Sequence, residues 1–241
     1  MNRWCDMLIK TIKVLSERSI LVYFGDSINE ETHQKIQYAV MLLREHSLVG
    51  ITEITCGYTN ICIHYDPLKI KKSVQQYAGS SVSEKVMTYL RDLLHRANRV
   101  EQVEGRVVEI PVRYGGEYGP DLAYVAEQNG LSPQEVIDIH TGGDYLVYML
   151  GFAPGFPFLG GLDPRIATPR KQTPRLKIEA GSVGIAGEQT GVYPLATPGG
   201  WQIIGRTAVD LFLPNEKPPT LLRAGDRIRF VAVEEDAKCY K

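Results

Sequence analysis

The stretch GFAPGFPFLGGLDPRIATPRKQTPR, residues 151–175, decides how the second half of the chain is interpreted. Its prolines remove backbone donors and its glycines relax the backbone, so neither a helix nor a central strand is expected to run through it. It presents Phe152, Phe156 and Phe158 from a stiff, irregular frame and then turns basic. Two interpretations follow: the rim of a ligand site, or a packed loop whose rings close the end of a barrel.

The sequence after Pro154 holds short apolar runs divided by Gly and Pro, without a helical period. Runs at 176–187, 191–197, 199–207 and 226–233 are typical of strands in a mostly-β barrel or sandwich. The second half is therefore predicted to be a mostly-β domain.

The segment before residue 151 adds two strands and two short helices to this domain. Strands are predicted at 106–115 and 144–152, and the helices within 119–142. Asp121 is expected to cap the first helix, and Ser132 and Glu135 have the spacing of a capping box at the second.

The first half has a different pattern, in which strands and helices alternate. A strand is predicted at 19–26, a helix at 29–46 capped by Asn29, and a hairpin at 50–66. Residues 71–100 are predicted to form a helix in two pieces. This order predicts a small α+β domain with an antiparallel sheet. The charge-rich, aperiodic segment between the halves places the domain limits at 1–100 and 106–241.

Composition excludes several classes of function. The chain has 241 residues, 44% of them hydrophobic, and a formal net charge of −1, so no general attraction to nucleic acid or an anionic membrane is expected. The uncharged run 145–162 contains two prolines and four glycines, which argues against a membrane span, and the N-terminus has no secretory pattern. We therefore expect a cytoplasmic protein. The four cysteines and five histidines show no metal-ligand spacing, so no metal site is predicted.

Five cations and no acid lie between Arg165 and Lys177. Within this basic run, Arg170 and Arg175 each follow a proline, which restricts their backbones. A pre-oriented guanidinium fork suits a carboxylate or a phosphate. The basic run is therefore predicted to bind an anion, the alternative being a solvated surface.

The stretch AGSVGIAGEQTGVYP, residues 180–194, lacks the G-x-x-x-x-G-K-[ST] pattern of a phosphate loop, which is absent from the whole chain. Its glycines suit barrel corners and bulges. Glu188 is the candidate for proton transfer, because its neighbours are uncharged; a surface turn is the alternative. His140, near the end of a short helix, is either a helix cap or a catalyst.

Four motifs in fixed order, GFAPGFPFLGGL, TPRKQTPR, AGSVGIAGEQTGVYP and GGWQIIGRT, closely resemble the KipI/PxpB family, also labelled allophanate hydrolase subunit 1. The resemblance covers residues 106–231 and, more weakly, the first half. It implies a cyclophilin-like β-barrel for the second half, after a small α+β domain.

The resemblance implies two functions. In one, the chain is the PxpB-type component of an ATP-dependent 5-oxoprolinase, which opens pyroglutamate to glutamate together with a KipA/PxpC-like component and a PxpA-like component. In that case ATP is bound only with the partner subunits, and the chain is inactive alone. In the other, it inhibits autophosphorylation of a sporulation histidine kinase and is antagonised by a KipA-like partner. The two are compatible, and the motifs do not separate pyroglutamate from urea-derived amides such as allophanate.

The resemblance also implies one pocket. Its catalytic residues would be Glu188 and His140, and its substrate-binding residues Phe152, Pro154, Phe156, Arg170, Arg175, Ser182, Gln189, Tyr193, Trp201 and Arg206. We expect Arg170 or Arg175 to hold the carboxylate of 5-oxoproline, while Phe156 and Trp201 pack on its ring.

Overall fold

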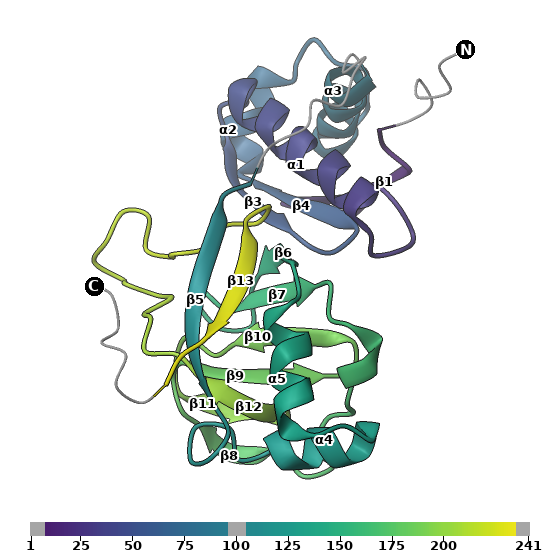
Figure 1. Ribbon diagram of the computed structural model, residues 1–241. Coiled ribbons are helices and arrows are strands. Elements are labelled where there is room, and N and C mark those ends of the chain that lie inside the picture. The colour runs from purple at the N-terminus through teal and green to yellow at the C-terminus, as the bar shows by residue number, and fades with distance from the viewer. Residues whose placement is uncertain (1–7, 96–104, 235–241) are drawn as a thin grey trace. The chain divides into compact units, whose positions relative to one another are not determined.

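The structure is a computed structural model that describes residues 8–95 and 105–234 (Figure 1). Contacts divide the chain into two compact units, Met1–Glu104 and Gly105–Lys241. A closed β-barrel, helices and open sheets together give a mixed α/β protein. The last part of the predicted segment 71–100, residues 96–100, lies outside the described residues.

The first unit is a four-stranded antiparallel sheet with helices. Its elements are β1 (Thr11–Ser16), β2 (Ser19–Tyr23), α1 (Glu30–Glu45), β3 (Ile51–Cys56), β4 (Asn60–Tyr65), α2 (Pro67–Ser73) and α3 (Val82–His95), and the strand order is β1-β2-β4-β3. The predicted strands, hairpin and broken helix are all present. Strand β1 was not predicted, because charged and polar residues interrupt its apolar positions.

Helix α1 shows why these predictions were correct. The side chain of Asn29 accepts a hydrogen bond from the backbone N–H of Thr32, which satisfies a donor that the first helical turn leaves unpaired. The apolar residues Ile36, Ala39 and Leu43 recur at helical spacing and are completely buried. The unit's core therefore lies between the sheet and its helices.

The second unit contains a closed barrel with the strand order β10-β7-β6-β13-β5-β12-β9. Its strands are β5 (Val107–Tyr114), β6 (Tyr145–Leu150), β7 (Pro157–Gly160), β9 (Ser182–Ala186), β10 (Gln189–Val192), β12 (Gln202–Arg206) and β13 (Arg227–Ala232). A separate ribbon pairs β8 (Arg175–Ile178) with β11 (Thr197–Gly199). Inward side chains such as Val183, Ile185 and Ile228 fill the barrel.

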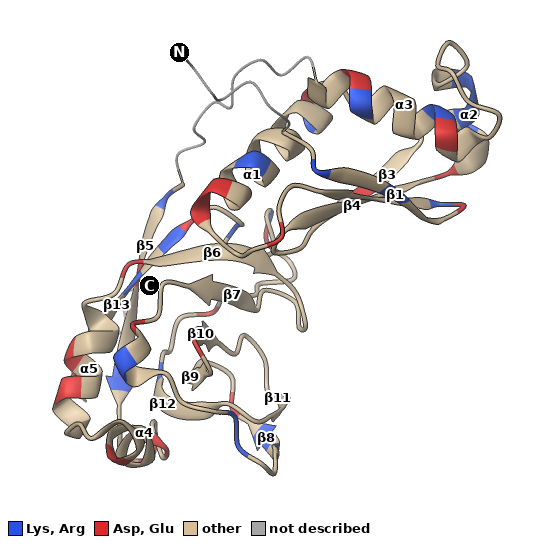
Figure 2. Cartoon of the chain, turned by 90° about the vertical axis from the view of Figure 1, so that its right-hand side faces the viewer, with Lys and Arg blue, Asp and Glu red and all other residues tan. Residues whose placement is uncertain are grey.

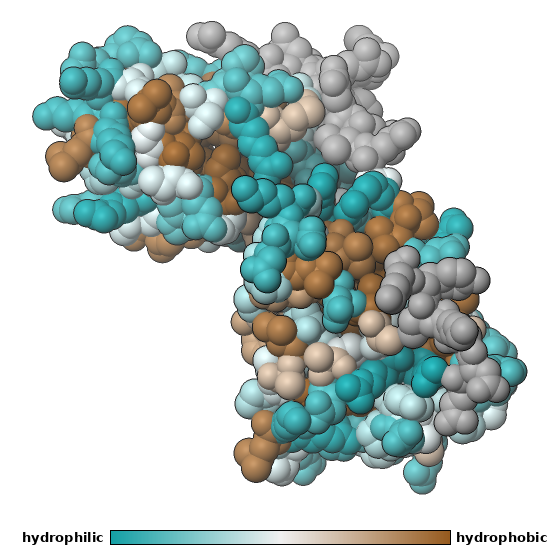
Figure 3. Space-filling model, turned by 90° about the vertical axis from the view of Figure 1, so that its left-hand side faces the viewer, coloured by the Kyte–Doolittle hydropathy of each residue, from teal (hydrophilic) through white to brown (hydrophobic). Residues whose placement is uncertain are grey.

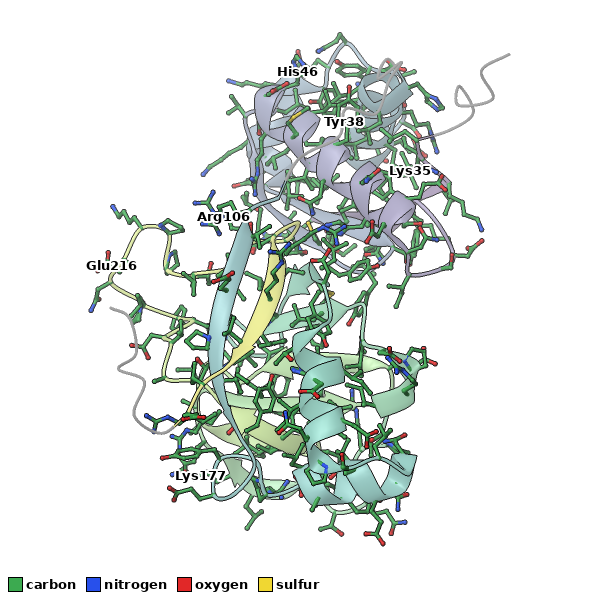
Figure 4. All side chains as sticks on the ribbon, viewed as in Figure 1. Lys35, Tyr38, His46, Arg106, Lys177 and Glu216 are labelled. Carbon is green, nitrogen blue, oxygen red and sulfur yellow. The ribbon has the colours of Figure 1, made fainter. Side chains whose placement is uncertain are left out.

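Barrel closure depends on the parallel pair β5 and β13. Arg106 (labelled in Figure 4) stands just before β5 and donates two hydrogen bonds to the carboxylate of Asp226, which stands just before β13. A bidentate guanidinium–carboxylate pair has a fixed geometry. This pair therefore sets the register in which the first and last strands of the barrel meet.

Helices α4 (Leu122–Asn129) and α5 (Pro133–Thr141) pack on the same core. Gly130 ends α4 in the left-handed conformation, and Ser132 with Glu135 forms the predicted capping box of α5. The prediction that Asp121 caps α4 was wrong. Its carboxylate makes no cap hydrogen bond and instead accepts hydrogen bonds from Arg175 and Lys171.

The predicted division into domains 1–100 and 106–241 remains a proposal about independent folding. We expect residues 105–241, expressed alone, to unfold cooperatively in urea, because their apolar core draws only on that unit. Circular dichroism and a urea titration of this fragment, with the whole chain as control, test the expectation. A broad, non-cooperative transition of the fragment would contradict it.

Candidate functional site

A second group of buried rings lies apart from the barrel core. We call it the aromatic cluster: Phe156, Ile178, Ala186, Tyr193, Trp201 and Ile203, with Ala153 and Phe158 packed against it. Phe156 is its centre, because its ring makes edge-to-face contacts of 5.3 Å with Tyr193 and 5.5 Å with Trp201. Three predicted site residues that are far apart in the sequence are therefore in direct contact.

Glycines make room for these rings. A Cβ at Gly191 would lie 3.1 Å from Cζ3 of Trp201 and 3.2 Å from Cζ of Phe156. A Cβ at Gly199 would lie 2.5 Å from the hydroxyl of Tyr193. The glycines at 191 and 199 thus allow rings to lie directly on the backbone of β10 and β11, which explains why the sequence is so rich in glycine here.

Phe152 occupies a strained position beside the cluster. Its φ of 65° lies in the left-handed region, which residues other than glycine adopt rarely. Its side chain is 69% exposed, although the ring also contacts Phe156 edge-to-face. Strain of this kind persists where surrounding structure enforces it, and it is concentrated at functional sites. Phe152 is therefore the apolar side chain of this loop that is most available to a ligand.

Arg170 stands over the indole of Trp201, with its Cζ 5.9 Å from the ring centroid. It is exposed, and its guanidinium makes no hydrogen bond or ion pair with any residue that the structure describes. The stacked guanidinium keeps its donors available while the ring limits its motion. This arrangement matches the predicted anion-binding role of Arg170.

Arg175 has a different role from the one expected. Its two Nη atoms donate to the two carboxylate oxygens of Asp121 at 2.8 Å, and Lys171 Nζ donates to the same carboxylate at 3.0 Å. The backbone N–H of Ile203 donates to Asp121 as well, at 2.7 Å. We call these four residues the Asp121 clamp. Arg175 is thus occupied by an internal carboxylate, which leaves Arg170 as the candidate for an external anion.

The clamp joins the basic run to strand β12. Burial by itself raises the pKa of Asp121, but the hydrogen bonds from Arg175, Ile203 and Lys171 outweigh burial and hold that pKa below its ordinary value. Asp121 is therefore ionised at neutral pH. In Figure 2, basic segments mark both β8 and the loop that leads to it. Lys177 of β8, labelled in Figure 4, pairs with Glu179 at the surface.

Tyr193 supplies a neutral hydroxyl to the same region. Burial raises the pKa of Tyr193 to about 12, although Arg170 and Arg175 act in the opposite direction. The backbone N–H of Trp201 also donates a hydrogen bond to this oxygen. The phenol keeps its proton at neutral pH, so it can donate a hydrogen bond to a carbonyl or an oxyanion.

The other residues expected in the pocket differ in exposure and in their distance from the aromatic cluster. Pro154 is exposed in the Phe152 loop, and Ser182 is buried in β9. Glu188 is exposed at the tip of the β9–β10 hairpin, with Gln189 half-buried next to it. Arg206 lines a different pocket, which shares no residue with the aromatic cluster. The structure therefore joins Phe152, Phe156, Arg170, Tyr193 and Trp201, but it does not bring Arg206 to them.

His140 lies inside the barrel. It is completely buried, with Nδ1 2.7 Å from the hydroxyl of Tyr114 and Nε2 2.9 Å from the hydroxyl of Thr190, and its ring stacks on Phe230 at 4.5 Å. Burial lowers the pKa of His140 to about 3, so the ring is neutral. Neither the helix-cap interpretation nor the catalytic one describes this position, since the ring hydrogen-bonds within the core and is closed to a ligand.

Sequence reasoning missed Asp121 and Lys171 as parts of the site. One signal was available: Lys171 and Arg175 lie in a run of five cations that contains no acid, so a carboxylate paired with them has to come from outside the run. Asp121 stands at a helix start, where a capping role is the default expectation. Its distance of 54 residues from Arg175 concealed the pairing.

Comparisons with known proteins show the family to which the chain belongs. Residues 10–222 match the family described as "Carboxyltransferase domain, subdomain C and D". A Bacillus subtilis protein described as the B subunit of 5-oxoprolinase is 51% identical over 231 residues, which cover 95% of this chain and 96% of that protein. The match covers most of the chain, so the chain is a protein of the class that this family model describes. The chain belongs to this family, and within it to the KipI/PxpB group.

Solved structures agree as well. The conserved uncharacterized protein PH0987 of Pyrococcus horikoshii is 44% identical, with a TM-score of 0.54, over 93% of this chain and 98% of its own. TTHA0988 is 34% identical, with a TM-score of 0.76, over 95% of this chain. This chain spans 41% of the length of TTHA0988, which is therefore a larger protein.

Two features are not found among the described residues. No group of three or more His, Cys, Asp or Glu side chains is arranged to hold a metal ion within 8–95 and 105–234. None of the helices in that part of the chain has the length and apolar character needed to cross a bilayer.

The Asp121 clamp makes a prediction about stability. Asp121→Ala leaves Arg175 and Lys171 without their buried counter-charge, so we expect the free energy of unfolding to fall by about 3 kcal/mol. Asp163→Ala is the matched control, because Asp163 pairs with Arg165 in an exposed position, and it is expected to cost less than about 1 kcal/mol. Urea unfolding measures both. Equal losses in the two variants would contradict the role of the clamp.

His140 makes a prediction about pH. Below about pH 6.5 the unfolded chain binds a proton that the folded barrel does not, so stability falls with pH by about 1.4 kcal/mol per unit. We expect the wild type to lose about 1.4 kcal/mol more than His140→Gln between about pH 7.5 and about pH 5.5. Urea unfolding at both pH values is the measurement. The same pH dependence in both proteins would show that His140 is not buried as a neutral ring.

Proposed function

We propose that the chain is the PxpB-type component of an ATP-dependent 5-oxoprolinase, which opens the lactam ring of 5-oxoproline to give glutamate. The observation that carries the proposal is Arg170, an exposed and unpaired cation held over Trp201. The substrate is a small ring that bears one carboxylate, so it needs one such cation beside apolar surface. The relatives described as the B subunit of 5-oxoprolinase, one of them 51% identical, support the same function.

Arg170 would bind the substrate carboxylate through its guanidinium fork. Phe152 would cover the methylene groups of the ring. This differs from the expectation that Phe156 and Trp201 contact the substrate, because their side chains are 2% and 5% exposed and pack on each other. They instead form the floor on which Phe152 and Arg170 stand. Tyr193, which is 2% exposed and contacts Phe156 edge-to-face, belongs to the same floor.

The remaining roles belong to this proposal too. Glu188 would move a proton, because the hairpin tip leaves its carboxylate in solvent. Pro154 and Ser182 would shape the loop and the floor, and Gln189 would lie beside Glu188. His140 and Arg206 have no role at this site, since one is closed inside the barrel and the other lines another pocket.

The sequence offers no phosphate-loop site for ATP. The sequence holds no phosphate loop, and no glycine-rich turn of that type leads into a described helix. We therefore derive no step through ATP on this chain. A KipA/PxpC-like component and a PxpA-like component would supply the ATP site and the rest of the catalytic groups, in the cytoplasm. The chain alone would then be inactive.

The kinase-inhibitor function stays a prediction from the resemblance. Measuring autophosphorylation of a sporulation histidine kinase with and without the chain is its direct test.

Arg170→Gln tests the proposed function. In the reconstituted three-component complex we expect KM for 5-oxoproline to rise at least about tenfold, because a charge-assisted hydrogen bond to the carboxylate is lost. Arg165→Gln is the matched control: it removes a cation of the same basic run that is paired with Asp163, and KM should not change.

The readout is ATP hydrolysis that depends on 5-oxoproline, with allophanate as the competing substrate. Unchanged KM in Arg170→Gln would remove Arg170 from the site. Turnover driven by allophanate but not by 5-oxoproline would assign a different substrate. ATP hydrolysis that depends on 5-oxoproline, catalysed by this chain without partners, would contradict the proposal that the partner components supply the ATP site.

A further inference from the structure

A pocket of about 400 Å³ opens on the second unit where β5, β9 and β12 approach one another. Its wall includes Pro111 and Arg113 of β5, Tyr118 of the following turn, and Arg206 and Thr207 at the end of β12. The volume is in the range of small-molecule sites. Figure 3 views the barrel unit from the side of the long loop between β12 and β13, where apolar and hydrophilic residues lie next to one another.

Two arginines meet in this pocket. Arg113 and Arg206 are direct cross-strand partners in the antiparallel pairing of β5 with β12. Directly opposite residues have Cβ atoms about 5 Å apart, and like charges at such positions destabilise a sheet. An anion bound beside them would add a charge-assisted interaction with the guanidinium of Arg206.

Both guanidinium groups are held in place. Arg113 lies over the ring of Tyr118, 5.5 Å from its centroid, and donates to the Tyr118 hydroxyl at 3.3 Å. Arg206 donates through Nε to the backbone oxygen of Ala180 at 3.0 Å. Its two Nη atoms make no hydrogen bond to the described part of the chain, so they can serve a ligand. A fork fixed in advance loses less entropy on binding.

Two hydroxyls add polar donors. Thr207 is 4% exposed, and its oxygen accepts a hydrogen bond from the backbone N–H of Val209 at 3.1 Å, which orients the hydroxyl. Tyr118 contributes its phenol to the same wall. Asp210, which is exposed, also lines the pocket and carries the opposite charge. The negative charge of Asp210 repels an extended polyanion, and a compact anion of low charge is repelled less.

We propose that the pocket between Arg113 and Arg206 binds the carboxylate or phosphate group of a small molecule, at a site separate from the aromatic cluster. The proposal does not depend on the 5-oxoprolinase function, because the two sites share no residue. It also gives Arg206 an anion-binding role at a place other than the one expected from the sequence.

Isothermal titration calorimetry of the whole chain tests the proposal, with inorganic phosphate and glutarate as separate probes at low salt. The Arg170→Gln background removes any contribution of the aromatic cluster. We expect one bound anion per chain in this background and at least about tenfold weaker binding after adding Arg206→Gln. Adding Arg206→Lys instead should weaken binding less, because the charge stays while the fork is lost.

Thermal unfolding of each variant checks that the fold is retained, and Arg206→Lys decides the outcome if Arg206→Gln does not fold. Tighter binding of phosphate than of glutarate assigns a phosphorylated ligand, and the reverse assigns a carboxylate. Absence of binding of both probes in the millimolar range would overturn the proposal. Equal affinity before and after the Arg206 substitutions would overturn it as well.

Discussion

The carboxylate of Asp121 is the interaction on which the candidate site depends. It binds Arg175, Lys171 and the backbone of Ile203 together, and so ties the start of helix α4, the basic run and strand β12 to one point. Arg170 directly precedes Lys171 of the clamp in the sequence, and Trp201 stands two residues before Ile203. A buried ion pair therefore holds the basic run that carries Arg170 to the strand that follows Trp201, and losing either partner of such a pair is costly.

Near the clamp, two glycines make room for the large rings of the aromatic cluster. The absence of side chains at Gly191 and Gly199 lets Phe156, Tyr193 and Trp201 settle on strands β10 and β11. The rings then fill the surface completely enough to act as a floor. Two exposed side chains contact these rings: the apolar Phe152 lies against Phe156, and the cationic Arg170 stands over Trp201.

Much of the fold could be predicted, since its signals are local. The Asn29 cap, the Ser132–Glu135 capping box and the alternation of Ile61, Ile63 and Tyr65 all act within a few residues. The site could be predicted only in part. Proline and glycine marked the irregular parts of 151–175, but the expectation that no central strand runs through this segment was wrong, since β7 (Pro157–Gly160) pairs with β6 and β10 in the barrel. The pairing of Asp121 with Arg175 joins distant segments, and His140 gave no sign that its ring enters the core.

The parallel pairing of β5 with β13 also bears on how the protein is made. The two strands are separated by more than a hundred residues, and Arg106 and Asp226 meet only when the later strand is present. During translation, β5 is synthesised long before β13, so the edge of β5 that pairs with β13 stays unpaired until the intervening chain has been made. Closure of the barrel is consequently a late event of biosynthesis.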